Sequence, residues 1–112
     1  MKQHPYSLSN AISRRDIRQS KWREQRKKRG FDDTELWNLD STIAKFVLPR
    51  LKAFKKLKGG RPYELSNDEW DDILDKMICS FSIIAKDSIN ADYELYQEGL
   101  DLFAKYFGYL WD

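Results

Sequence analysis

The stretch LSNDEWDDILDKMICSFSIIAK, residues 65–86, decides the fold class of this chain. Ser66 and Glu69 have the spacing of a capping box, in which each side chain accepts a hydrogen bond from the backbone N–H of the other. The stretch therefore predicts an amphipathic helix from about Asn67 to about Lys86. Its apolar residues recur every three or four positions, at Trp70, Ile73, Leu74, Met77, Ile78, Phe81 and Ile84.

A second apolar stripe precedes this helix. It has helical spacing and stops at the Gly-Gly pair of residues 59–60, which favours the end of a helix. Pro49 lies inside the stripe and removes a backbone hydrogen bond, so we expect a kink near residues 45–49. Two starts fit the preferences for N-cap residues, one at residues 33–34 and one at residues 40–41. The apolar positions are Leu39, Ile43, Phe46, Val47, Leu51, Phe54 and Leu57.

A third stripe predicts a last helix, capped by Ser88 or Asn90. Its apolar positions are Tyr93, Tyr96, Leu100, Phe103, Phe107 and Leu110. No segment alternates as a strand would, and 112 residues suit one domain with a modest core. The predicted fold class is all-α: a small three-helix bundle over residues 31–112, with an N-terminal basic helical arm over residues 1–30.

The net charge of +2 conceals two oppositely charged segments. Residues 1–30 carry ten basic and two acidic side chains, a net charge of +8. Residues 31–112 carry ten basic and sixteen acidic side chains, a net charge of −6. Charge of this kind bears on association with partners rather than on the fold. The chain therefore offers a basic and an acidic candidate surface.

The basic run of the arm favours binding to nucleic acid. Lysine and arginine at this density neutralise phosphates and release counterions, and Trp22 among them suggests stacking on a base. Docking on an acidic protein surface and a solvated face without a specific partner are the alternatives. The candidate residues are Arg14, Arg15, Arg18, Lys21, Trp22, Arg23, Arg26, Lys27, Lys28 and Arg29. The track would continue over Lys45, Arg50, Lys52, Lys55, Lys56 and Lys58.

The acidic candidate surface lies at the start of the helix over residues 67–86. Its string DDILD, residues 71–75, matches a short Mg²⁺-diphosphate pattern, but the chain is too small for a prenyl-transfer fold and we expect no metal site. A solvated acidic face is the favoured interpretation. The functional alternative is a row of carboxylates that imitates phosphates in the nucleic-acid channel of a partner protein. The residues are Asp68, Glu69, Asp71, Asp72 and Asp75.

The segment GFDDTELWNLD, residues 30–40, is rich in aromatic and acidic residues. One interpretation is a binding surface. The favoured interpretation is structural: Phe31, Leu36 and Trp37 close the end of the core, while Asp32 and Asp33 act as helix caps.

The residue inventory argues against an enzyme. The single histidine, His4, lies near the N-terminus, and the single cysteine, Cys79, lies between Ile78 and Phe81, where we expect an inert thiol that acts as a small hydrophobic residue. Neither a disulfide nor a zinc site with four His or Cys ligands is available. We expect no catalytic residues and no cofactor. No apolar run is long enough for a membrane span or a signal peptide, so we expect a cytoplasmic protein.

Several strings resemble a family of small uncharacterised proteins encoded by tailed bacteriophages. They are GFDDTELWNLDSTIAKFVLPRLKAFKK, GGRPYEL, DEWDDILDKM and YQEGLDLFAKYF, within about residues 30–107. The resemblance implies a phage origin and the cytoplasm of the host cell, but no particular chemistry. It leaves out the basic arm.

These observations lead to one functional hypothesis and one alternative. The first is a small non-enzymatic protein that associates with nucleic acid or a nucleoprotein complex through its basic arm. The alternative is an inhibitor that binds a host nucleic-acid enzyme or defence complex, with the acidic face as the contact. The choice between DNA and RNA and the oligomeric state stay open.

Overall fold

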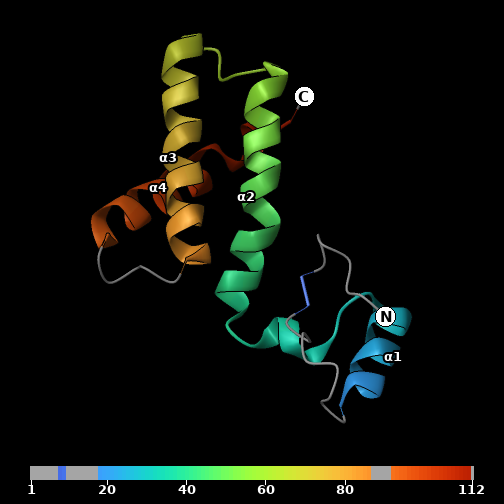
Figure 1. The fold of residues 1–112 in the computed structure, drawn as a ribbon. Helices are drawn as coiled ribbons and strands as arrows, with labels where there is room; N and C mark the ends of the chain where they lie inside the picture. The colour runs from blue at the N-terminus through green and yellow to red at the C-terminus, as the bar shows by residue number, and fades with distance from the viewer. Residues whose placement is uncertain (1–7, 10–17, 87–91, 112) are drawn as a thin grey trace. The chain divides into compact units, whose positions relative to one another are not determined.

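A computed structural model of the protein describes residues 8–9, 18–86 and 92–111. Every regular element within these residues is helical (Figure 1), which confirms the all-α fold class. The elements are α1 (Gln19–Arg29), the 3₁₀ turn η1 (Asp33–Leu36), α2 (Leu39–Leu57), α3 (Asn67–Ala85), α4 (Tyr93–Tyr106) and the 3₁₀ turn η2 (Phe107–Tyr109). The chain divides into two compact units, Met1–Thr42 and Ile43–Asp112. Residues 31–42 thus group with α1, whereas the sequence placed the boundary at residue 30.

The capping box at the start of α3 is confirmed. The Ser66 hydroxyl accepts the backbone N–H of Glu69 at 3.1 Å, and the Ser66 N–H donates to Glu69 Oε1 at 2.9 Å. The hydrogen bonds that Glu69 accepts from Ser66 hold the pKa of its carboxyl below the ordinary value. This reciprocal pair satisfies two of the backbone donors that a helix N-terminus leaves open.

Helix α2 differs from the sequence prediction at its start. It begins at Leu39, and the carbonyl of Asn38, a residue with a φ of +51°, accepts the N–H groups of Ser41 and Thr42. The helix thus begins one residue before the predicted pair 40–41, and the Asp40 carboxylate accepts the N–H of Ser41 at 2.8 Å within the first turn. The helix then continues through Pro49 to Leu57. The cap predicted for the last helix, Ser88 or Asn90, lies outside the described residues, and Asp92 holds the N-cap position of α4.

The core of the second unit lies where α2, α3 and α4 meet (Figure 1). Its buried members are Ala44, Leu51, Trp70, Leu74, Met77, Phe81, Ile84 and Tyr106. Most of the apolar stripe on α3 is buried as predicted. The stripe on α2 is divided, since Leu39, Ile43, Phe46 and Leu57 are exposed. Its apolar arc is wider than the surface that the neighbouring helices cover.

Gly99 allows α3 and α4 to approach closely. A Cβ atom at this position would lie 2.3 Å from the Cβ of Ser80 and 2.4 Å from the carbonyl oxygen of Lys76, both on α3. The buried Ser80 hydroxyl donates to the carbonyl of Tyr96 at 2.7 Å, which ties the two helices together at the same level. The contact therefore requires a residue without a side chain on α4.

Candidate functional site

Helix α1 presents two faces of different chemistry. At 100° per residue, Trp22, Gln25, Arg26 and Arg29 share one side, and all four contact other residues of the first unit. We call the rest of the helix surface the outer face of α1. Its basic residues, all exposed, are Lys21, Arg23, Lys27 and Lys28.

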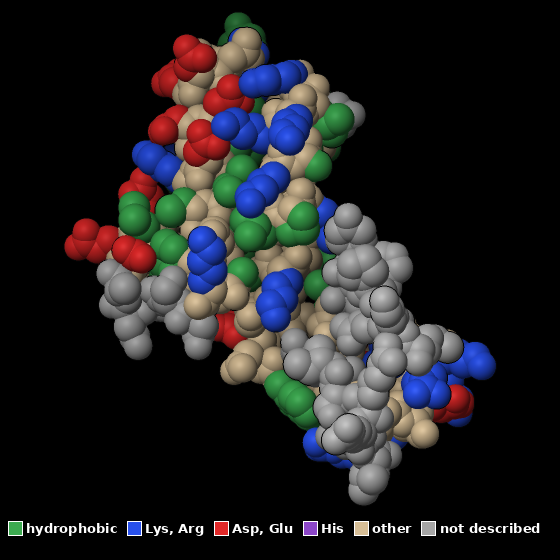
Figure 2. Space-filling view, in the orientation of Figure 1, with side chains coloured by type: hydrophobic (Ala, Val, Ile, Leu, Met, Phe, Trp, Pro, Cys, Tyr) green, Lys and Arg blue, Asp and Glu red, His purple; other side chains and the backbone are tan. Residues whose placement is uncertain are grey.

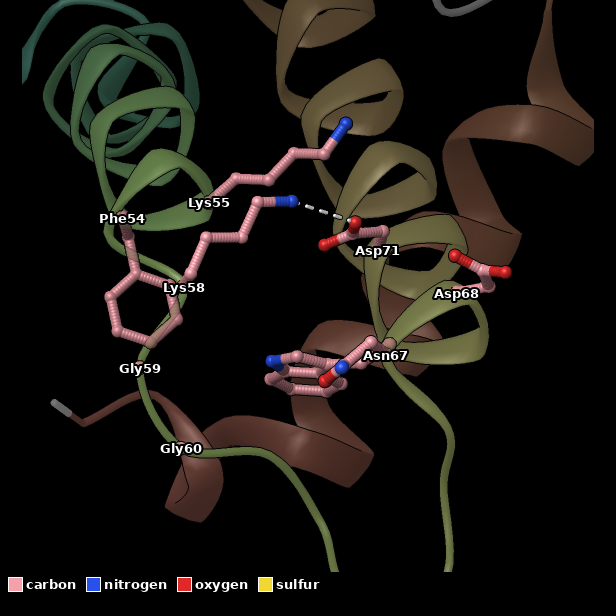
Figure 3. Close-up of a pocket in the computed structure, with 9 residues that line it drawn as sticks. Phe54, Lys55, Lys58, Gly59, Gly60, Asn67, Asp68 and Asp71 are labelled. Carbon is pink, nitrogen blue, oxygen red and sulfur yellow. Dashed lines mark hydrogen bonds and ion pairs between the residues drawn. The ribbon is translucent and has the colours of Figure 1, made fainter.

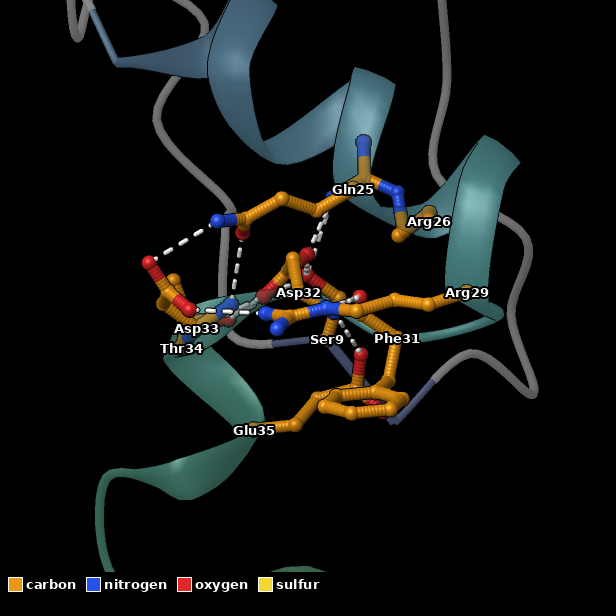
Figure 4. Close-up of polar contacts among 9 residues, drawn as sticks. All are labelled: Ser9, Gln25, Arg26, Arg29, Phe31, Asp32, Asp33, Thr34 and Glu35. Carbon is orange, nitrogen blue, oxygen red and sulfur yellow. Dashed lines mark hydrogen bonds and ion pairs between the residues drawn. The ribbon is translucent and has the colours of Figure 1, made fainter.

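The inner side of α1 is held by a buried carboxylate (Figure 4). The Asp32 side chain is fully buried and accepts hydrogen bonds from the hydroxyls of Ser9 and Thr34, from the Arg26 guanidinium and, at 2.9 Å, from the Thr34 N–H. Its own backbone N–H donates to Glu35 Oε2 at 2.8 Å, which caps η1. One side chain therefore joins residue 9, α1 and η1.

Asp33 makes a second set of bonds to the same helix (Figure 4). Its carboxylate accepts from Arg29 at 2.7 Å and from Gln25 at 2.9 Å, and its backbone N–H donates to Gln25 Oε1 at 2.9 Å. The hydrogen bonds from Gln25 and Arg29 hold the pKa of Asp33 below the ordinary value. Two arginines of the basic run thus contact the residues that follow α1: Arg26 bonds to the buried Asp32, and Arg29 bonds to Asp33 at the surface.

Trp22 belongs to this packing and not to the exposed basic surface. Its side chain is 4% exposed, and its ring meets that of Trp37 edge to face, with centroids 5.8 Å apart. The Arg18 guanidinium lies 4.7 Å from the Trp22 centroid, a cation–π contact. Because its ring is enclosed, Trp22 would have to leave this packing to stack on a nucleobase, and the stacking stays a prediction.

The structural interpretation of residues 30–40 is correct in part. Asp32 is a cap, but Phe31, Leu36 and Trp37 stay substantially exposed rather than closing the core. The division of α1 into two faces was not predicted from the sequence. The signal was present: Trp22 is the one strongly apolar residue of the helix, and Arg26 and Arg29 follow it at helical spacing.

The outer face of α1 keeps its positive charge. The Lys21 Nζ atom lies 3.7 Å from Asp33 Oδ2, and the Lys28 Nζ atom lies 3.3 Å from Glu24 Oε1. Both pairs are solvent-exposed, and such pairs contribute little to the stability of a fold. Arg23 and Lys27 make no ion pair with any residue in the part of the chain that the structure describes. Two of the predicted candidates, Arg14 and Arg15, lie outside the described residues.

The second unit carries a separate set of cations on α2. Figure 2 shows Lys and Arg side chains along α2 and Asp and Glu side chains over α3. Lys55 pairs with Asp75 at 2.6 Å, and Lys58 pairs with Asp71 at 3.0 Å. The hydrogen bond to Asp75 raises the pKa of Lys55. These pairs connect α2 to α3 across a groove of about 350 Å³.

A pocket lies at the end of this groove, where α2 leads into the turn before α3. It has a volume of about 290 Å³. Figure 3 shows Lys55 and Lys58 reaching from α2 toward α3, with the Lys58–Asp71 pair closing one side. Asp68 also lines the pocket, so its walls carry both signs of charge. This mixture gives it no clear preference for an anion or a cation.

The acidic candidate residues are mostly engaged within the protein. Glu69 caps α3, and Asp71 and Asp75 pair with α2. Asp72 pairs with Lys76 at 3.4 Å, and Lys76 also contacts Glu98 at 3.0 Å; the hydrogen bonds to Glu98 and Asp72 raise the pKa of Lys76. Among the described residues, no three His, Cys, Asp or Glu side chains are grouped as a metal site would need. The phosphate-mimicking surface stays a prediction.

The buried carboxylate makes the first unit sensitive to acid. Burial raises the pKa of Asp32, but hydrogen bonds from Ser9, Thr34 and Arg26 outweigh it and hold the pKa below the ordinary value. A carboxyl with a lowered pKa stabilises the fold above its unfolded pKa, about 3.9, and this contribution is lost as pH falls through the lower folded value. We therefore expect the first unit to lose stability below about pH 4.

The measurement compares the wild type with Asp32→Asn, which has no carboxyl to titrate at this position. The difference between their free energies of unfolding, taken from urea titrations, is expected to shrink as pH falls from neutral to about pH 2. A difference that stays constant over this range would contradict the role of Asp32.

Comparisons of the chain with protein-family models, with curated proteins and with solved structures return no match. The phage resemblance therefore stays a prediction. No helix in the described part of the chain has the length and apolar character needed to cross a membrane.

Proposed function

We propose that the protein binds nucleic acid through the outer face of α1. One observation carries the proposal: the helix is fixed from its inner side by Trp22, Asp32 and Asp33, so that Lys21, Arg23, Lys27 and Lys28 project from an ordered scaffold. Cations that are already in place bind with less loss of conformational entropy than those of a flexible tail.

The dimensions of α1 suit a phosphate backbone. Eleven residues span about 16 Å, and the four cations are distributed over more than two turns. A helix of this size fits a groove of a duplex or lies along one strand. The contacts are to phosphates, so the proposal concerns backbone binding and not the reading of sequence. Each neutralised phosphate releases counterions, which makes affinity fall as salt rises.

The test is the double variant Arg23→Gln/Lys27→Gln. Its affinity is measured by fluorescence anisotropy with a labelled duplex DNA of about 20 base pairs and a single-stranded RNA of the same length. We expect binding about tenfold weaker or more, and a slope of log affinity against log salt that is shallower by about 2. Neither residue contacts the inner network, so the helical circular dichroism should not change.

The control is Arg61→Gln/Lys105→Gln, which removes the same charge from exposed positions outside the basic run. It should bind almost as the wild type does. Equal losses in the two double variants would mean that only net charge matters, and would contradict a specific role of α1. The wild type binding neither probe at low salt would also reject the proposal.

A further inference from the structure

Helix α2 has a third face, which lies outside the core and beside the row of exposed lysines Lys45, Lys52 and Lys56. It consists of Ile43, Phe46, Arg50, Ala53 and Leu57, and we call it the α2 seam. These positions are separated by three and four residues in alternation, the spacing of the contact positions in a coiled coil. All five are exposed: Ile43 by 50%, Phe46 by 46% and Leu57 by 59%.

The seam is a continuous surface and not a set of scattered side chains. Residues three and four apart are neighbours on a helix, so its large apolar side chains form one strip along α2. The core of the second unit uses a different side of the same helix, which carries Ala44 and Leu51. An exposed apolar strip rimmed by charges is characteristic of an interaction site.

Arg50 places a positive charge in the middle of the seam. Its guanidinium lies 3.8 Å from the centroid of the Phe46 ring and donates to the Phe46 carbonyl at 2.9 Å. Both contacts fix the guanidinium over the apolar strip. A docking helix must therefore meet a positive charge at the centre of an otherwise apolar contact.

One edge of the seam is basic as well. Lys45, Lys52 and Lys56 are exposed and lie on the adjoining side of α2. In a dimer made by pairing two seams, the arginines would approach each other, and an antiparallel pairing would also bring the lysine rows together. Like charges in such positions are destabilising. The charges thus disfavour a second copy of this chain and favour a partner of the opposite charge.

We infer that the α2 seam binds an amphipathic helix of a partner protein, one with an apolar stripe, an acidic residue within that stripe and an acidic flank. Ile43, Phe46 and Leu57 would pack against the stripe, and the small Ala53 leaves room for a large side chain of the partner. The central acid would meet Arg50, and the acidic flank would meet the lysine row. This site is separate from the outer face of α1.

The test uses two synthetic helical peptides of about 20 residues with leucine at the contact positions. One carries glutamate within the stripe and on its flank, and the other carries lysine at those places. Fluorescence anisotropy should give a dissociation constant below about 100 μM for the glutamate peptide and at least tenfold weaker binding for the lysine peptide. Ile43→Ser and Phe46→Ser should each weaken binding of the glutamate peptide about tenfold.

A charge-reversal variant distinguishes this proposal from nonspecific hydrophobic binding. Arg50→Glu should weaken binding of the glutamate peptide and strengthen binding of the lysine peptide. The control Tyr63→Ser removes a side chain that is 98% exposed in the turn before α3, and should change neither. Circular dichroism should confirm that every variant keeps its helical content, since the replaced side chains are half exposed.

Three results would overturn the inference. The first is no binding of the glutamate peptide at about 100 μM. The second is equal binding of both peptides, or binding that Ile43→Ser does not change. The third is a dimer of the wild type in analytical ultracentrifugation that Ile43→Ser converts to a monomer, because the seam would then belong to a second copy. Nucleic-acid binding by α1 is measured separately and is not decided by these results.

Discussion

Asp32→Asn is expected to destabilise the first unit strongly. The carboxylate of Asp32 is fully buried and accepts four hydrogen bonds, from Ser9, Arg26 and Thr34. Asparagine offers one acceptor oxygen, directs an NH₂ group at the remaining donors and removes the charge that balances Arg26. Breaking a buried ion pair by losing one partner costs about 3–5 kcal/mol, and the partial exposure of the Arg26 side chain, 29%, places the expected loss toward the lower end of this range. That loss is a large fraction of the stability of a small folded unit.

Hydrogen–deuterium exchange followed by mass spectrometry gives the local readout. Amides of residues 19–29 should lose most of their protection in the variant, while those of α3, in the second unit, keep theirs. Asp33→Asn is the matched control, since it makes the same chemical change next to Asp32 at a residue that is only half-buried. Its effect should be much smaller. Unchanged protection of α1 in Asp32→Asn would show that the carboxylate does not hold this helix.

Gly99→Ala is expected to destabilise the second unit by about 1–2 kcal/mol. The added methyl group meets the Cβ of Ser80 and the backbone carbonyl of Lys76 at distances that no contact tolerates, so α4 must move away from α3. Overpacking of this kind costs about 1–3 kcal/mol or more. Alanine is the better helix former by up to about 1 kcal/mol, and that gain does not compensate. The midpoint of thermal unfolding should fall by about 10 °C.

Gly108→Ala provides the control. A Cβ at Gly108 meets nothing within 4 Å, and this residue does not require a left-handed backbone. Its unfolding midpoint should stay within about 2 °C of the wild type. If Gly99→Ala were as harmless as Gly108→Ala, the close approach of α3 and α4 would not be a feature of the folded protein.

The helices of the second unit were predictable because their signals are local. The capping pair Ser66 and Glu69 and the apolar spacing that follows it lie within a few helical turns. This local pattern defines both the start of α3 and its buried side. The close approach at Gly99 was not predictable. It depends on which residue of α3 faces position 99, and that requires the crossing of two helices to be known.

The candidate site was predictable in composition but not in arrangement. The basic run is plain in the sequence, yet nothing local says that Arg26 reaches Asp32 or that Ser9 joins them from 23 residues away. The seam was missed for another reason. Periodicity assigns apolar residues to a helix, but it does not say how much of the apolar arc the neighbouring helices will cover. Ile43 and Phe46 therefore looked like core residues.

The inner network of α1 has a consequence for the tolerance of this segment to mutation. The run RKKR, residues 26–29, is uniform in charge, but its first and last residues bond to Asp32 and Asp33, whereas its middle two bond to neither. Arg26 and Arg29 use planar guanidinium groups that donate several bonds at fixed angles, and the ammonium group of lysine does not reproduce this geometry. Exchange between lysine and arginine is thus a conservative change at residues 27 and 28. At residues 26 and 29, the same exchange alters the hydrogen bonds to Asp32 and Asp33 that position α1.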